Sequence, residues 1–180
     1  MKIIGITGTL GAGKGTIVEY LIKEKKYLHF SVRSYLIKQI NKRGLEVNRD
    51  SMTMVANELR AQNNPAFVVE ELYKEAEQSG NNSVIESIRT PGEIEFLKSK
   101  GNFILLAVDA DPKIRYQRIT LRASETDIID FDTFIANEKR EMTSTDPNKQ
   151  NLSKCIEMAD FVLNNNGTVE ELISQLNNIV

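Results

Sequence analysis

The sequence predicts an α/β fold in three layers, with a five-stranded parallel sheet between helices and a helical lobe at one end. Five short, nearly continuous apolar runs alternate with helical patterns, as in sheets that are covered on both faces. A glycine-rich stretch lies between the first apolar run and the first helical pattern. The connection between the second and third runs is much longer than a minimal crossover needs, and it predicts the lobe at about residues 32–80.

Five runs are the predicted strands: residues 2–7, 27–31, 83–87, 103–109 and 160–163. Within the lobe, helical patterns cover about residues 32–43, 51–62 and 66–79. Capping boxes start at Thr90 and Thr168. Asn64-Pro65 and Asp111-Pro112 each place a capping residue before a proline, and Gly80 and Gly101 stand where glycines end helices.

The composition narrows the classes of function. With 180 residues, the chain has the size of one domain, and we expect a single domain over residues 1–180. A net charge of -2 gives no diffuse attraction to nucleic acid or anionic lipid, so we expect neither as a partner. The single Cys155 excludes an internal disulfide and is expected to be a buried filler; the lone His29 is expected to be a packed strand residue. No secretory signal or membrane span is visible, which predicts a cytoplasmic protein.

The stretch after the first strand carries the most specific motif. It fits GxxxxGK and continues with a further glycine and a threonine: Gly8, Thr9, Leu10, Gly11, Ala12, Gly13, Lys14, Gly15 and Thr16. Glycines let the backbone wrap closely around a phosphate, the following helix adds partial positive charge at its N-terminus, and the lysine supplies a point charge to the β- and γ-phosphates. This P-loop predicts nucleoside-triphosphate binding.

The loop resembles the GxxGxGKGT loop of adenylate kinase and related nucleoside monophosphate kinases, which share the extra glycine. The resemblance implies the P-loop NTPase fold of nucleotide kinases, with ATP as phosphoryl donor and Mg²⁺ as cofactor. It also implies that Thr16 is the loop residue on the side of the bound Mg²⁺. A GTP switch is not expected because the chain has no DxxG and no NKxD sequence.

Glu86 and Arg89 follow the third predicted strand. Ligands of open parallel sheets collect beyond the carboxyl ends of the strands, so both side chains are expected to face the phosphates. An exposed strand-end pair is the alternative. The segment resembles the Asp-Gly-Phe-Pro-Arg segment of adenylate kinases, although Glu replaces Asp and the proline is absent. That resemblance implies a phosphate-binding and catalytic role for Arg89 and a magnesium-binding role for Glu86.

Arg115, Arg118 and Arg122 lie on one face of the helix that follows the fourth strand. Asp111 stands four residues before Arg115, so that pair is expected to be a surface ion pair. Arg118 and Arg122 have no acid three or four positions before them, which leaves them for a transferring phosphoryl group or a solvated basic face. They resemble arginines at the start of the lid in adenylate kinase-like enzymes, and residues 118–150 are the predicted lid region.

Two further regions are candidates for ligand contact. The segment from Ala159 to Thr168 resembles the C-terminal part of dephospho-CoA kinases, which implies that Asn165 and Gly167 back the adenine of ATP; a turn and a helix cap explain the same residues. After the second strand, Phe30-Ser31-Val32-Arg33-Ser34 contains no acid. Arg33 and Arg60 are therefore candidates to hold an anionic acceptor, as well as plain surface charges.

These residues predict a small-molecule kinase that transfers the γ-phosphoryl group of ATP to a nucleoside monophosphate. The acceptor phosphate is already ionised, whereas a hydroxyl acceptor needs a base to take its proton. Glu86 can serve as that base, so transfer to a ribose hydroxyl, as in dephospho-CoA kinases, remains an alternative. The second alternative is a regulatory module that binds ATP without transferring its γ-phosphoryl group.

Overall fold

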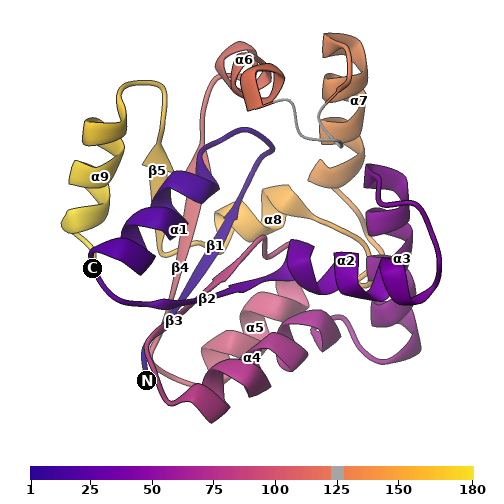
Figure 1. The fold of residues 1–180 in the computed structure, drawn as a ribbon, viewed down its shortest axis with the longest axis horizontal. Helices are drawn as coiled ribbons and strands as arrows, with labels where there is room; N and C mark the ends of the chain where they lie inside the picture. Colours follow the sequence, from indigo (N-terminus) through magenta and orange to yellow (C-terminus); the bar gives the residue numbers. More distant parts are fainter. Residues whose placement is uncertain (123–127) are drawn as a thin grey trace.

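The computed structural model describes residues 1–122 and 128–180. All five strands are parallel and lie in the order β2-β3-β1-β4-β5 (Figure 1). The strands are β1 (Ile3–Gly8), β2 (Leu28–Ser31), β3 (Ser83–Glu86), β4 (Phe103–Asp109) and β5 (Phe161–Asn164). The predicted α/β P-loop fold with a five-stranded parallel sheet is confirmed.

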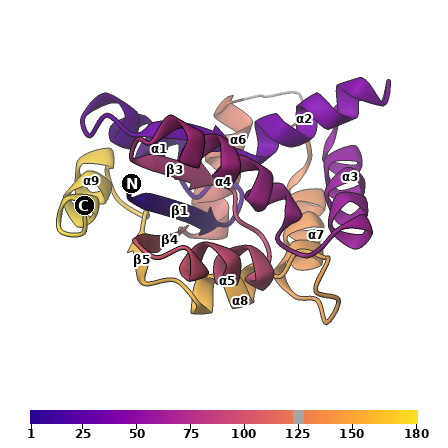
Figure 2. The same cartoon turned by 90° about the horizontal axis from the view of Figure 1, so that it is seen from below.

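Helices cover both faces of this sheet. In the described ranges they are α1 (Lys14–Lys23), α2 (Val32–Lys42), α3 (Arg49–Gln62), α4 (Phe67–Ser79), α5 (Pro91–Ser99), α6 (Pro112–Arg122), α7 (Phe131–Met142), α8 (Leu152–Glu157) and α9 (Val169–Asn177). One buried cluster joins the sheet to α1 and α9, and the other joins it to α4, α5 and α8 (Figure 2). Ile3 points into the second cluster and Ile4 into the first, as strand alternation requires.

The long connection between β2 and β3 contains α2, α3 and α4. Its first two helices extend beyond the sheet and face α7, whereas α4 runs back along the sheet (Figure 1). Val69 and Leu72 of α4 share a core cluster with Ile85 of β3. The helix predicted as the third member of the lobe therefore also covers the sheet, because its apolar stripe is broad enough to be buried there.

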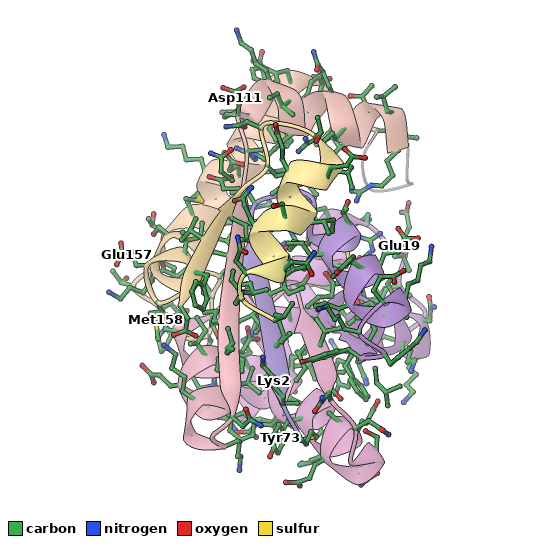
Figure 3. The ribbon with its side chains drawn as sticks, turned by 90° about the vertical axis from the view of Figure 1, so that its left-hand side faces the viewer. Lys2, Glu19, Tyr73, Asp111, Glu157 and Met158 are labelled. Atoms are coloured by element: carbon green, nitrogen blue, oxygen red, sulfur yellow. The ribbon has the colours of Figure 1, made fainter. Side chains whose placement is uncertain are left out.

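Several loops gather at the carboxyl ends of the strands. Gly8 at the end of β1 pairs with Val108 near the end of β4, and Ile6 pairs with Glu86 at the end of β3. Lys2, just before β1, and Asp111, just after β4, lie at opposite ends of the sheet (Figure 3). The loops after β1, β3 and β4 thus meet at one edge, where ligands of parallel sheets bind.

The helix boundaries follow the predicted caps with one difference. Thr90 and Thr168 each form a complete capping box, and Gly80 ends α4 in the left-handed conformation, with φ of 68°. Before α4, however, the N-cap is Ala66 instead of Asn64. The Asn64 Oδ1 atom accepts a hydrogen bond from the Ala66 backbone at 2.8 Å, so Asn64 closes a turn that precedes the helix.

The two residues that composition singled out lie in different surroundings. Cys155 is fully buried, as expected, and burial raises the pKa of its thiol to about 12. His29 is exposed, so the prediction of a packed strand residue is wrong; β2 is an edge strand and leaves it uncovered. Among the described helices, none is both long enough and apolar enough to cross a bilayer.

Candidate active site

The glycine-rich loop after β1 folds as a phosphate cradle. Gly8 has φ of 137° and Gly13 has φ of 106°, a region that residues with side chains rarely adopt. A Cβ atom on Gly8 would lie 2.1 Å from the Val108 carbonyl oxygen, so glycine alone fits. Helix α1 starts at Lys14 without a side-chain cap, which leaves its first amides for a ligand.

Lys14 lies at the centre of this cradle. Its Nζ atom donates to the carbonyl oxygens of Gly8 at 2.9 Å and Thr9 at 2.7 Å. Burial and the neighbouring Arg89 lower the pKa of Lys14 to about 7, whereas Glu86 and Glu141 act in the opposite direction. The lysine is therefore held close to its titration point, and an arriving polyphosphate would favour the charged form.

Two side chains brace the loop from behind. The Thr9 hydroxyl donates to Asp109 Oδ1 at the end of β4, at 2.6 Å, and the Asn165 amide donates to the Ala12 carbonyl at 2.8 Å. Asn165 is only 6% exposed. Its side chain thus fixes the backbone of the loop, a contact that the sequence did not predict.

Arg115 corrects an expectation from the sequence. It is only 2% exposed, and its guanidinium pairs with Glu138 of α7 instead of forming the predicted surface pair with Asp111. It also donates to the carbonyl oxygen of Leu10 at 3.3 Å. Because α7 packs over α6, this arginine is covered and ties both helices to the phosphate loop.

One cavity of about 730 Å³ extends from the phosphate loop to the helical lobe. Among the described residues, six arginines and Lys14 line it, with only two carboxylates, Glu86 and Glu141. The arginines are Arg33, Arg49, Arg60, Arg89, Arg118 and Arg122. An apolar patch consisting of Val32, Leu36, Met52 and Ala56 belongs to the same lining. The cavity suits a ligand that is strongly anionic and has an apolar face.

All three predicted catalytic arginines and both predicted acceptor arginines line this cavity. Arg89 donates to Glu141 Oε2 at 3.2 Å, and Arg33 approaches the Met52 sulfur at 3.8 Å. Arg60 is 1% exposed and binds Glu93 through Nε and Nη2. Arg118 has a buried Nη1 atom without a hydrogen-bond partner in the described ranges.

The predicted nucleotide-binding positions fall into two groups. Those that line the cavity are Leu10, Gly11, Gly13, Lys14, Gly15, Thr16 and Arg118. Gly8, Ala12, Asn165 and Gly167 do not belong to its lining. For Gly8, Ala12 and Asn165 the reason is that they form or support the back of the loop.

Thr16 and Glu86, the two predicted magnesium-side residues, lie on the cavity wall. Glu86 Oε1 accepts a hydrogen bond from Ser31 at 2.8 Å, and Oε2 accepts one from Ser87 at 3.0 Å. In the described ranges, no group of three or more His, Cys, Asp or Glu side chains is arranged so that it could hold a metal ion. A carboxylate and a hydroxyl are oxygen donors that fit Mg²⁺ when phosphates and water supply the remaining ligands.

The sequence did not single out Arg49, Glu141 or Gln150 as site residues, although all three line the cavity. Glu141 Oε1 accepts from Arg49 Nη2 at 2.6 Å. The two residues are 92 positions apart, so no local spacing joins them. The start of α3 offered a weak signal, because Asn48 and Ser51 form a capping box around Arg49.

A glycine-rich phosphate loop on this sheet order defines a P-loop domain with a kinase-like fold. The chain belongs to the family described as an AAA domain, whose model matches residues 4–146, and to the UPF0200 family. A UPF0200 protein of Methanococcus vannielii is 30% identical over 183 residues, with 100% of this chain and 95% of the relative covered.

Solved structures share the fold. TT1252 from Thermus thermophilus has a TM-score of 0.61 at 20% identity, with 99% of this chain and 95% of that chain covered. Shikimate kinase from Bacteroides thetaiotaomicron has a TM-score of 0.61 at 13% identity, with 99% and 97% covered. At these identities the likeness concerns the fold alone.

Proposed function

We propose that this chain is a magnesium-dependent kinase that transfers the γ-phosphoryl group of ATP to the phosphate of a nucleoside monophosphate. One observation carries the proposal. A single cavity joins the phosphate loop around Lys14 to an arginine-rich wall of the helical lobe. A nucleotide-binding domain that only holds ATP has no need for a second set of cations beside the phosphates.

The donor side follows from the P-loop. The amides at the start of α1 and the Lys14 ammonium hold the β- and γ-phosphates of ATP. Arg89, Arg118 and Arg122 offset the charge that spreads over the transferring group. The likeness to dephospho-CoA kinases supports a place for Asn165 and Gly167 behind the adenine of ATP, and Asn165 also fixes the phosphate loop through the Ala12 carbonyl.

Thr16 and Glu86 are the residues that would hold Mg²⁺. A bound magnesium ion neutralises charge between the β- and γ-phosphates. The hydroxyls of Ser31 and Ser87 orient the Glu86 carboxylate through the hydrogen bonds described above. These hydroxyls fix the position of the carboxylate beside the cavity.

The acceptor side combines charge with an apolar surface. Arg33, Arg60 and Arg89 hold the acceptor's phosphate, and the patch that includes Leu36 and Met52 packs against its base. Residues 118–150 form the lid, whose closure excludes water from the transferring group. Residues 123–127 of that segment lie outside the described residues.

The likeness of residues 8–16 to the loop of adenylate kinase-like enzymes supports this proposal, as does the kinase-like fold. A hydroxyl acceptor, as in dephospho-CoA kinases, is the second candidate because Glu86 lies on the cavity wall and can accept a proton. In that reaction the product keeps its original phosphate and gains another at the ribose.

The test is ADP formation from ATP and magnesium over a panel of ribo- and deoxynucleoside monophosphates and dephospho-CoA. The proposal expects ADP release that depends on one or more monophosphates, with a nucleoside diphosphate as the second product. Phosphorylation of dephospho-CoA without activity on any monophosphate supports the hydroxyl reaction instead. ADP release that no acceptor increases, at a rate near zero, leaves an ATP-binding regulatory module.

A further inference from the structure

Glu141 connects three elements across the cavity. It lies at the end of α7 and is only 4% exposed. Its two carboxylate oxygens accept hydrogen bonds from different arginines: Arg49 at the start of α3, at 2.6 Å, and Arg89 after β3, at 3.2 Å. A single carboxylate therefore holds together two guanidinium groups that line the cavity.

The arginines keep donors that Glu141 does not use. Arg49 Nε and Arg60 Nη1 are buried and have no hydrogen-bond partner among the described residues. An unpaired buried polar atom destabilises the folded protein. Because both arginines line the same cavity, their unpaired donors point to a ligand that supplies hydrogen-bond acceptors.

The chemistry of these donors selects an oxyanion with several oxygens. Arginine forks bind carboxylate and phosphate oxygens in pairs, and arginine stays charged inside proteins. Glu141 has two oxygens, which are already used by two arginines. A phosphate group has three free oxygens and up to two charges, so it can also satisfy the donors left by Arg49 and Arg60.

Glu141 and a phosphate cannot occupy the space between these arginines together, since two anions in contact repel strongly. We propose that the Glu141 carboxylate is a placeholder for the acceptor's phosphate, which displaces it from Arg49 and Arg89. This inference rests on the proposed function and extends its acceptor site to Arg49. In the ligand-free protein the placeholder keeps the two arginines close in the absence of substrate.

Displacement has a consequence for α7. Once its carboxylate is released, the last turn of this helix loses its buried contacts to Arg49 of α3 and to Arg89 after β3, and keeps only the exposed Arg140–Asp50 pair with α3 among the described ion pairs. Helix α7 also binds α6 through Glu138 and Arg115, and α6 carries Arg118 and Arg122. Arrival of the acceptor is thus coupled to the helix pair that carries the arginines for the transferring group.

The experiment measures binding of inorganic phosphate to the full chain that has been saturated with magnesium and the β,γ-imido analogue of ATP, so that the phosphate loop is filled. Titration calorimetry is performed on the wild type and on Glu141→Gln. Removal of the competing charge is expected to tighten phosphate binding about tenfold or more. Glu58→Gln is the matched control, because it removes the same charge from an exposed pair with Arg43, and it should change the affinity less than twofold.

Equal or weaker phosphate binding by Glu141→Gln would mean that Glu141 is a permanent counter-ion, and the inference would be overturned. If Glu141→Gln does not fold, Glu141→Asp takes its place: the shorter carboxylate holds the arginines less firmly and should also tighten phosphate binding. Unchanged affinity in that variant contradicts the inference as well.

Hydrogen exchange of the wild type gives a second readout. Phosphate should increase exchange at the amides of residues 138–142, and a decrease or no change contradicts displacement. Neither measurement needs turnover. If phosphate displaces Glu141 but no monophosphate is phosphorylated, the anion site is supported and the proposed function fails. If a monophosphate is phosphorylated but phosphate does not displace Glu141, the proposed function holds and only the placeholder inference is overturned.

Discussion

The two ends of the cavity obtain their ligand groups in different ways. The phosphate loop would supply them from consecutive residues, 8–16, mostly as backbone amides. The opposite wall takes its charges from side chains at positions 49, 60, 89 and 141, which lie on three separate segments: α3, the loop after β3, and α7. Glycine conformations fix the first end, whereas the second depends on ion pairs between distant elements. A site of the first kind is encoded locally, and one of the second kind exists only after folding.

This contrast predicts that substitution of one loop residue, Lys14, lowers phosphoryl transfer more than substitution of any one residue of the wall. Lys14→Ala should reduce phosphoryl transfer to the background of the assay, a loss of about 10³-fold or more, because it deletes the one loop side chain directed at the β- and γ-phosphates. Steady-state ADP production measures it. Lys23→Ala, at the exposed far end of the same helix, is the control and should retain full activity. Normal turnover by Lys14→Ala would remove the basis of the proposed function.

The arginines should show smaller individual effects. Arg89→Ala, Arg118→Ala and Arg122→Ala are each expected to lower kcat by about 10²- to 10³-fold, as expected for groups that stabilise developing charge. The fold should persist, which circular dichroism can verify. Arg43→Ala changes an arginine that is outside the cavity and should leave kcat unaltered. Wild-type rates in all three cavity variants would make these residues plain surface charges.

The smallest effect concerns pH. The pKa of Lys14 is lowered to about 7 in the ligand-free protein, and phosphates favour the charged lysine. Above pH 7, binding of magnesium and the ATP analogue must therefore take up a proton, and affinity should fall by up to tenfold per pH unit. Below pH 7 this dependence disappears. Calorimetry in two buffers of different ionisation enthalpy should detect up to one proton taken up at pH 8.

The same group affects folding stability with a defined sign. Between pH 7 and 10.5 the unfolded chain keeps the Lys14 proton that the folded chain has released, so ligand-free stability should rise with pH through this window. Lys14→Met removes the titrating group and should flatten both dependences. An affinity that is constant from pH 7 to pH 9 in the wild type would contradict the lowered pKa.

The sequence was sufficient for the fold and the loop because both depend on local patterns. Apolar runs of strand length can be recognised in the sequence without knowledge of tertiary contacts. The same is true of the glycines in the loop, whose backbone conformations other residues rarely adopt. Arg49 was missed because its helix was expected to begin at residue 51, whereas its cap is Asn48. The capping box there uses Ser51 in place of the usual Glu or Gln.

Arg115 was misjudged and Glu141 was missed for a different reason. In sequence, both stand among mixed charges that are typical of a solvated helix. They are buried because α7 packs against α6 and faces the lobe, so that each finds a partner of opposite charge far along the chain. Periodicity cannot predict this burial, because the side chains that cover these charges come from other elements.

Glu93 has a consequence for motion of the lobe. One of its oxygens accepts from Arg60 of α3, and the other accepts from the Arg89 and Thr90 amides at the start of α5. Movement of α3 away from α5 would leave a buried charge without its partner, at a cost of about 3–5 kcal/mol in stability. The lobe should therefore pivot about this carboxylate without separating from it, and the ends of α2 and α3 farthest from Glu93 should travel the greatest distance.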